Sequence, residues 1–171
     1  VLDEVFSCLT AWLAPIICFT AEEAWLARNP GDDESVHLRT YPDVPADWQD
    51  TGVAEKWSTI RHIRRVVTGA LELERAEKRI GSSLQATPTV YLGDEYATAL
   101  DGVDLAEISI TSQIVIESGA APADAFTIDD VPGVAVVPGL ADGGKCERCW
   151  QVLVEVGSDG DNPEICNRCA D

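Results

Sequence analysis

The chain has 171 residues, of which 46% are apolar and five are tryptophan, so it can bury a core as one domain or two small ones and is not a disordered polymer. The formal net charge of −18 argues against a nonspecific polyanion binder, because an acidic body repels a phosphate backbone. No run of about 18 apolar residues is present, so the sequence predicts no membrane span and no membrane partner.

The first half of the chain is predicted to be helical. Apolar residues recur at helical spacing over residues 1–28, which we expect to form two helices, and Thr20 with Glu23 has the pattern of a capping box at the start of the second. The apolar opening lacks a basic leader, which argues against a signal peptide. Residues 50–80 carry an apolar stripe of period close to 3.6, which predicts one long helix that stops at Gly81.

After the long helix the pattern changes. Alternating or continuous apolar runs predict strands at residues 87–92 and 108–117, with a short helix between them and short strands after them. We therefore predict an α+β fold in three parts: a helical bundle portion with one long helix (residues 1–83), a small α+β module (residues 84–140) and a C-terminal four-cysteine zinc knuckle (residues 141–171).

Four of the six cysteines form two Cys-x-x-Cys pairs, namely Cys146, Cys149, Cys166 and Cys169. Sixteen residues separate the pairs, which is the spacing of a four-cysteine structural zinc site. Two thiolates on one tight turn can both face inward, and two such turns complete a tetrahedron. Since four protein ligands leave no coordination position for a catalytic water, we expect one structural Zn²⁺, whose binding supplies folding energy to the knuckle.

Other uses of the paired cysteines are redox motifs, an iron site of the rubredoxin type, or disulfides. Disulfides rarely require such clustering, so the pattern favours a reducing, cytoplasmic setting. Cys8 and Cys18 lie in an apolar, helix-like stretch and are interpreted as small core residues.

The basic residues are concentrated in two places despite the acidic total. Seven of the twelve Lys and Arg lie between residues 56 and 79, three lie in or beside the cysteine pairs, and none lies between residues 80 and 144. Two such patches could dock a phosphate backbone while the acidic body suppresses wrong contacts. Alternatively, the charges on the long helix form a solvated face with internal ion pairs.

Trp150 directly follows the second cysteine of the first pair. One interpretation is that its ring packs over the metal knuckle. The other is that the ring is a stacking platform for an unpaired base, flanked by Lys145 and Arg148.

Three strings occur together and in a fixed order: "LAPIICFTAEEAW" (13–25), "IRHIRRVVTGALELERAEKRIGSSLQA" (60–86) and "KCERCW…EICNRC" (145–169). They resemble the C-terminal part of bacterial isoleucyl-tRNA synthetases. The first string is shared more loosely with valyl and leucyl relatives. The segment "ELERAEKRIGSSLQA", followed by the four-cysteine knuckle, narrows the resemblance to the isoleucyl family.

The resemblance implies that the helical part belongs to an anticodon-binding domain and that the module and knuckle close over the anticodon end of tRNA(Ile). The parent enzyme would ligate isoleucine to this tRNA with ATP and Mg²⁺, acting as a monomer. The family's catalytic strings, His-Ile-Gly-His and Lys-Met-Ser-Lys-Ser, are absent, as is its editing domain, and the chain contains no methionine. We therefore expect a piece of a longer protein that binds tRNA and does not catalyse.

The candidate RNA-binding residues follow from matching the family's basic helix and its knuckle. They are Arg61, Arg64, Arg65, Arg75, Lys78, Arg79, Lys145, Arg148, Trp150 and Arg168.

Two other functions stay open on the sequence alone. A DNA-binding zinc finger of the formamidopyrimidine-DNA glycosylase type uses a similar four-cysteine spacing, but its finger hairpin is basic, whereas residues 151–164 are acidic. The third hypothesis is a protein-interaction scaffold with a structural zinc ion, and the net charge of −18 is its support.

Overall fold

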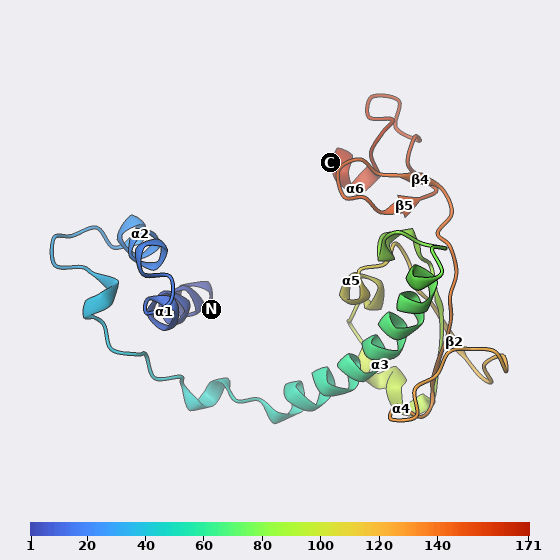
Figure 1. Ribbon diagram of the computed structural model, residues 1–171, viewed down its shortest axis with the longest axis horizontal. Coiled ribbons are helices and arrows are strands. Elements are labelled where there is room, and N and C mark those ends of the chain that lie inside the picture. Colours follow the sequence, from blue (N-terminus) through green and yellow to red (C-terminus); the bar gives the residue numbers. More distant parts are fainter. The chain divides into compact units, whose positions relative to one another are not determined.

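The computed structural model describes residues 1–171 (Figure 1). The chain divides into two units, Val1–Asp50 and Thr51–Asp171. The second unit contains the long helix, both sheets and all four paired cysteines. None of the helices combines the length and the apolarity that crossing a bilayer requires.

The first unit consists of helices and connecting segments. Its elements are α1 (Leu2–Leu13), α2 (Cys18–Arg28) and the 3₁₀ turns η1 (Val36–Leu38) and η2 (Ala46–Trp48). Helices α1 and α2 pack through Phe6 and Trp25, whose ring centroids lie 6.2 Å apart in a stacked arrangement. The Arg39 guanidinium covers the Trp25 ring at 4.0 Å, so a cation–π contact helps to hold the connecting segment on the helices.

The start of α2 differs from the prediction. The two helices are present, but α2 begins at Cys18, with Ile17 as its N-cap and no side-chain cap. The backbone N–H of Ile17 donates to the Leu13 carbonyl at 2.8 Å, so the chain turns directly from α1 into the next helix. Thr20 therefore lies inside the first turn of α2, and the predicted capping box is wrong.

Helix α3 (Thr51–Ala76) is the long helix expected from the apolar stripe. Its core-facing side chains begin at Ile60, and the most deeply buried of them are Ile60, Ile63, Val66, Val67, Ala70 and Leu71. Leu73, which the stripe placed inward, is 52% exposed. The side chains of the core-facing stripe pack on the three-stranded sheet, including Val90 and Val136.

Helix α3 ends earlier than the predicted stop at Gly81. Lys78 has a φ of 60°, in the left-handed region. Its N–H donates to the Arg75 carbonyl at 3.0 Å, and the N–H of Arg79 donates to the Glu74 carbonyl at 2.9 Å. These two bonds form the helix-ending arrangement that usually has glycine at the left-handed position. A lysine occupies that position here, which is why the glycine signal misplaced the end.

The three-stranded sheet has the order β2-β1-β3. Its strands are β1 (Thr89–Leu92), β2 (Val115–Ser118) and β3 (Val134–Val137). β1 pairs with β2 in parallel, with Thr89 opposite Val115, and with β3 in antiparallel, with Thr89 opposite Val137. Short helical segments connect β1 to β2: α4 (Asp94–Ala97), η4 (Thr98–Leu100) and α5 (Leu105–Ser109).

The predicted strand at residues 108–117 is wrong in its first half. Residues up to Ser109 belong to α5, because the Asp104 carboxylate accepts hydrogen bonds from the N–H groups of Ala106 and Glu107 and caps that helix. Ile110 then takes a left-handed conformation with a φ of 57° and ends α5. Alternation of apolar residues could not reveal this cap, and the strand begins only at Val115.

The C-terminal segment has the expected four-cysteine knuckle, with two short strands and one short helix. Its elements are β4 (Gly144–Lys145), β5 (Val152–Leu153) and α6 (Asn167–Ala170). The knuckle follows the sheet in the chain, and Figure 1 shows its two strands near the C-terminal end of α3. The mixed helix-and-sheet architecture with clustered cysteines confirms the predicted α+β class.

Candidate metal centre and nucleic-acid interface

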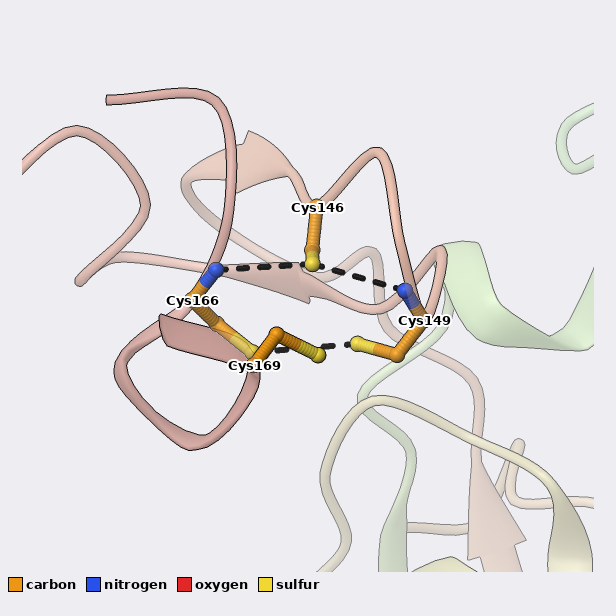
Figure 2. A group of neighbouring side chains, drawn as sticks. All are labelled: Cys146, Cys149, Cys166 and Cys169. Atoms are coloured by element: carbon orange, nitrogen blue, oxygen red, sulfur yellow. Dashed lines mark hydrogen bonds between the residues drawn. The ribbon is translucent and has the colours of Figure 1, made fainter. Parts of the chain in front are cut away.

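The four paired cysteines come together in the knuckle. Their sulfur atoms all lie within 4.8 Å of one another, and Figure 2 shows the side chains converging from the two turns. The Sγ atoms of Cys149 and Cys166 are 3.8 Å apart. A tetrahedral site with Zn–S bonds of about 2.3 Å requires sulfur–sulfur separations of roughly 3.8 Å. The arrangement therefore fits a four-thiolate zinc site.

The local backbone explains why the first cysteine turn closes. Trp150 has a φ of 67°, and its N–H donates to the Cys146 carbonyl at 2.8 Å. The N–H of Cys146 donates in return to the Gln151 carbonyl at 2.8 Å. The left-handed residue thus reverses the chain directly after the second cysteine, so that both thiols of the turn face the same point.

Gly143 is required by a close backbone approach in front of this turn. Its φ is +114°, and a Cβ at this position would lie 2.3 Å from the Leu153 carbonyl group. No side chain fits between the two segments, so glycine allows β4 to pair closely with β5. Behind the cysteines, Leu153, Val156 and Ile165 form a small apolar packing. So small a core supplies little folding energy, which metal ligation would supplement.

The thiols of the cluster differ in acidity. Burial of the Cys146 thiol disfavours its charged form, but the backbone N–H groups of Cys149, Cys166 and Arg148 outweigh burial and lower the pKa of Cys146 to about 6. Burial, together with hydrogen bonds that the Cys169 thiol donates to the neighbouring cysteine sulfur atoms, raises the pKa of Cys169 to about 12. Burial therefore favours the protonated form of the Cys169 thiol, and binding of a metal ion would displace that proton.

The candidate RNA-binding residues lie in two clusters. The α3 cluster consists of Arg61, Arg64, Arg65, Arg75, Lys78 and Arg79, and the knuckle cluster consists of Lys145, Arg148, Trp150 and Arg168. Both clusters belong to the same unit of the chain.

Within the α3 cluster, half of the cations have carboxylate partners. The pairs are Arg65 with Asp130 at 3.2 Å, Arg75 with Glu72, and Arg79 with Glu74 and Glu77. Arg64 instead donates through Nε to the Ile108 carbonyl at 2.9 Å and fastens α3 to α5. The side chains of Arg61 and Lys78 are exposed and make no hydrogen bond or ion pair within the chain. The interpretation of a solvated face with internal pairs thus describes part of this cluster and not all of it.

The knuckle cluster contains no ion pair with a carboxylate. Arg148 donates through Nη1 to the Cys169 carbonyl at 2.6 Å and links the two cysteine turns. Arg168 donates to the Gln151 side chain at 3.4 Å. The Lys145 ammonium lies 5.8 Å from the centroid of the Trp150 ring. Trp150 is 60% exposed and is not among the side chains that pack behind the cysteines.

The end of α3 and the knuckle meet at a groove of about 320 Å³. Arg79 and Gln85 line it from the side of the helix end, and Ala141 and Val152 line it from the side of the knuckle. A backbone hydrogen bond holds the two segments together, since the Ala141 N–H donates to the Gln85 carbonyl at 2.8 Å. Arg79 of the α3 cluster therefore lies where the end of the helix meets the knuckle.

Sequence reasoning missed the residues that join the knuckle to the body. The Ser112 hydroxyl donates to the Leu84 carbonyl at 2.5 Å and accepts from the Val152 N–H at 2.7 Å. The Gln85 side chain accepts from the N–H groups of Gly81 and Ser82, in a capping box that shapes η3 (Ser83–Gln85). No local pattern in the sequence indicates these roles for Gln85 and Ser112.

Comparison with known proteins bears on both parts of the chain. The model of the anticodon-binding domain of tRNA ligase matches residues 1–90, and the model of the zinc finger found in FPG and IleRS matches residues 143–171. The isoleucine–tRNA ligase of Brucella abortus (strain 2308) is 54% identical to this chain over 98% of the chain's length. That of Agrobacterium fabrum (strain C58) is 50% identical over 99% of the chain's length. A third relative, the isoleucine–tRNA ligase of Bartonella quintana, is 48% identical over 99% of the chain.

The chain spans only 17–18% of the length of these relatives. The zinc-finger model alone covers both glycosylases and synthetases, but the match over residues 1–90 does not favour the DNA-repair alternative. The chain therefore belongs to the family of tRNA-ligase anticodon-binding domains, and it corresponds to the anticodon-binding and zinc-finger region of bacterial isoleucyl-tRNA synthetases.

Proposed function

We propose that the chain binds the anticodon stem-loop of tRNA(Ile) through the α3 cluster and the knuckle cluster together. The observation that carries this proposal is the junction of the end of α3 with the knuckle, where Arg79 of the α3 cluster and Val152 of the knuckle line one groove. Six of their nine cations have no carboxylate partner, so their charges stay available to phosphates. The family's anticodon-binding description and the names of the relatives supply the ligand class.

In this proposal the zinc ion is structural. Cys146, Cys149, Cys166 and Cys169 hold one Zn²⁺, which fixes the two turns that carry the knuckle cluster. Arg148 spans the turns through the Cys169 carbonyl, so it both stabilises the knuckle and presents charge. Trp150, exposed and left-handed, offers a flat ring on which an unpaired base can stack.

The chain has three parts in this proposal. Residues 1–83 form the helical anticodon-binding portion, and residues 141–171 form the zinc-binding knuckle. Residues 84–140 form the α+β module that joins these two parts. The whole enzyme ligates isoleucine to tRNA(Ile) in the cytoplasm as a monomer. It binds ATP and Mg²⁺ in a catalytic domain outside these 171 residues. The present chain has neither of the family's catalytic strings, so its own task is recognition.

The proposal is tested by measuring the affinity of the zinc-loaded chain for a fluorescent anticodon stem-loop of isoleucine tRNA over a range of salt concentrations. We expect tighter binding than to duplex DNA of equal charge, and an affinity that falls as salt rises. Equal affinity for the two nucleic acids would reject anticodon recognition.

Matched lysine variants test the surface. Lys78→Ala and Lys145→Ala should each weaken stem-loop binding and reduce the salt slope by about 0.7–0.9. Lys56→Ala is the control, because Lys56 lies near the start of α3, at the end opposite to Lys78, and its ammonium donates to the Asp101 carbonyl. An effect of Lys56→Ala as large as that of Lys78→Ala would show that binding follows total charge and not the proposed surface.

A further inference from the structure

A second groove, of about 250 Å³, lies between α5 and the knuckle. Three segments that are far apart in the sequence line it. Leu84 comes from η3, Glu107 and Ile110 come from α5 and its end, and Gln151 and Arg168 come from the knuckle. The groove is smaller than the roughly 300–1,000 Å³ of drug-sized ligand sites, so it suits a single ring system.

The walls of this groove are held at a fixed separation. Ser112 is 6% exposed, and its hydroxyl binds Leu84 on one side and the Val152 N–H on the other. Its own N–H donates to the Ala86 carbonyl at 3.2 Å. Moving the knuckle away from α5 would break these partly buried hydrogen bonds, and leaving them unmade costs free energy. The groove is therefore built into the fold and does not depend on a mobile loop.

The polar groups of the groove suit the edge of a base and not a phosphate. The Glu107 carboxylate has no partner in the chain and can accept hydrogen bonds, whereas the Asp104 carboxylate beside it already caps α5. Two carboxylates on one wall repel a phosphate. On the opposite wall, which includes Cys149, the Gln151 side-chain oxygen accepts from Arg168 at 3.4 Å and from the Cys149 thiol at 3.6 Å. The Gln151 amide nitrogen and the other N–H groups of the Arg168 guanidinium can donate to a ligand.

Ile110 adds an apolar surface at the rim. Its side chain is 57% exposed although the residue is β-branched and left-handed, with a φ of 57°. A β-branched residue in that region is strained, and such residues gather where ligands bind. An aliphatic side chain held there can lie against the face of a flat ring.

We propose that this groove holds one unpaired nucleobase of the bound RNA, of the class that carries an exocyclic amino group. The inference rests on the proposed function and specifies how the knuckle reads a base. Glu107 accepts the amino group, Arg168 or Gln151 donates to a ring acceptor, and Ile110 covers the ring face. The phosphates stay outside, along the cations of the knuckle cluster.

A coupling experiment on the full 171-residue, zinc-loaded chain tests the groove. Glu107→Gln removes the strong acceptor and keeps the size of the side chain. Glu117→Gln is the matched control, because Glu117 is an exposed carboxylate on β2 and the change in net charge is the same. Each variant is titrated with anticodon stem-loops of isoleucine tRNA in which one loop nucleotide after another is abasic.

We expect Glu107→Gln to bind the unmodified stem-loop about tenfold more weakly than Glu117→Gln. At one loop position the abasic change should cost the control about tenfold and cost Glu107→Gln almost nothing further, because both changes remove the same contact. Replacing that nucleotide by an analogue without the amino group should reproduce the abasic loss.

The possible failures are distinct. If the stem-loop binds but Glu107→Gln is additive with every abasic position, the groove proposal is wrong and the proposed function stands. If the control chain binds the stem-loop no better than duplex DNA of equal charge, the proposed function fails and the groove proposal fails with it. Unchanged zinc content and melting temperature in both variants exclude loss of folding as the cause.

Discussion

Replacing Ser112 by alanine tests the junction between the knuckle and the body. The hydroxyl makes two hydrogen bonds, at 2.5 Å to the Leu84 carbonyl and at 2.7 Å from the Val152 N–H. Ser112→Ala removes both and leaves one acceptor and one donor without their partners. Losing these bonds lowers the stability because the serine is only 6% exposed, so water cannot fully replace them. Leu84 and Val152 are both partly open to water, which reduces the effect.

The size of the effect follows from the two groups left unpaired. A buried polar group that loses its partner costs about 1–3 kcal/mol, and partial access to water lowers this value. We therefore expect Ser112→Ala to lower the free energy of unfolding by about 2–3 kcal/mol. The zinc content should not change, because Ser112 contacts no cysteine of the cluster.

Urea denaturation gives the stability, and hydrogen exchange at the Val152 amide gives the local effect. Ser118→Ala is the control, since Ser118 is an exposed serine at the end of β2. Equal stability of the two variants, with equal protection of the Val152 amide, would refute the idea that this hydroxyl fixes the knuckle to the body.

Four further changes test other parts of the account. Cys149→Ser should abolish binding of the single zinc ion, with loss of the knuckle's exchange protection, as measured by metal analysis and hydrogen exchange; full zinc content in the variant would contradict the ligand set. Trp150→Ala should weaken stem-loop binding by about 1–3 kcal/mol in anisotropy titrations, with little change in melting temperature, and an unchanged affinity would return the ring to a packing role. Lys78→Gly should raise the free energy of unfolding by about 0.5–1 kcal/mol, because glycine relieves the left-handed strain at the end of α3, and it should weaken RNA binding at the same time. Protonation of Glu74 should lower the free energy of unfolding in acid, because the hydrogen bond with Arg79 lowers the pKa of the Glu74 carboxyl below its ordinary value of 4.5. That stabilisation is complete above pH 4.5 and is lost as the pH falls through the lowered pKa, so Glu74→Gln should flatten the acid limb of a stability–pH curve; an unchanged limb would show that the ion pair contributes nothing.

Local patterns in the sequence predicted those features that depend on spacing. The two Cys-x-x-Cys pairs gave the four-cysteine cluster, and the period of apolar residues gave α1, α2 and α3. Both signals arise from geometry that repeats along the chain, so they can be recognised without knowing what packs against them.

Features that depend on contacts between distant segments could not be predicted. Ser112 acts by joining Leu84 to Val152, and no local pattern marks a serine for that role. Lys78 and Ile110 adopt left-handed conformations that are more common for glycine. Because neither residue is a glycine, the sequence did not show that the chain turns there, and the predicted end of α3 and start of β2 were misplaced. Pairing of the α3 cations with carboxylates also includes Asp130, which is 65 residues away from Arg65 in the sequence.

In the proposed function, the metal-fixed knuckle and the end of α3 form one surface for RNA. Titration of the isoleucine tRNA anticodon stem-loop into the zinc-loaded chain, and into the same chain after chelation, tests whether this surface depends on the metal. We predict that chelation weakens binding at least about tenfold, equal to about 1.4 kcal/mol, and that added Zn²⁺ restores it. An affinity that stays the same without zinc would contradict this dependence.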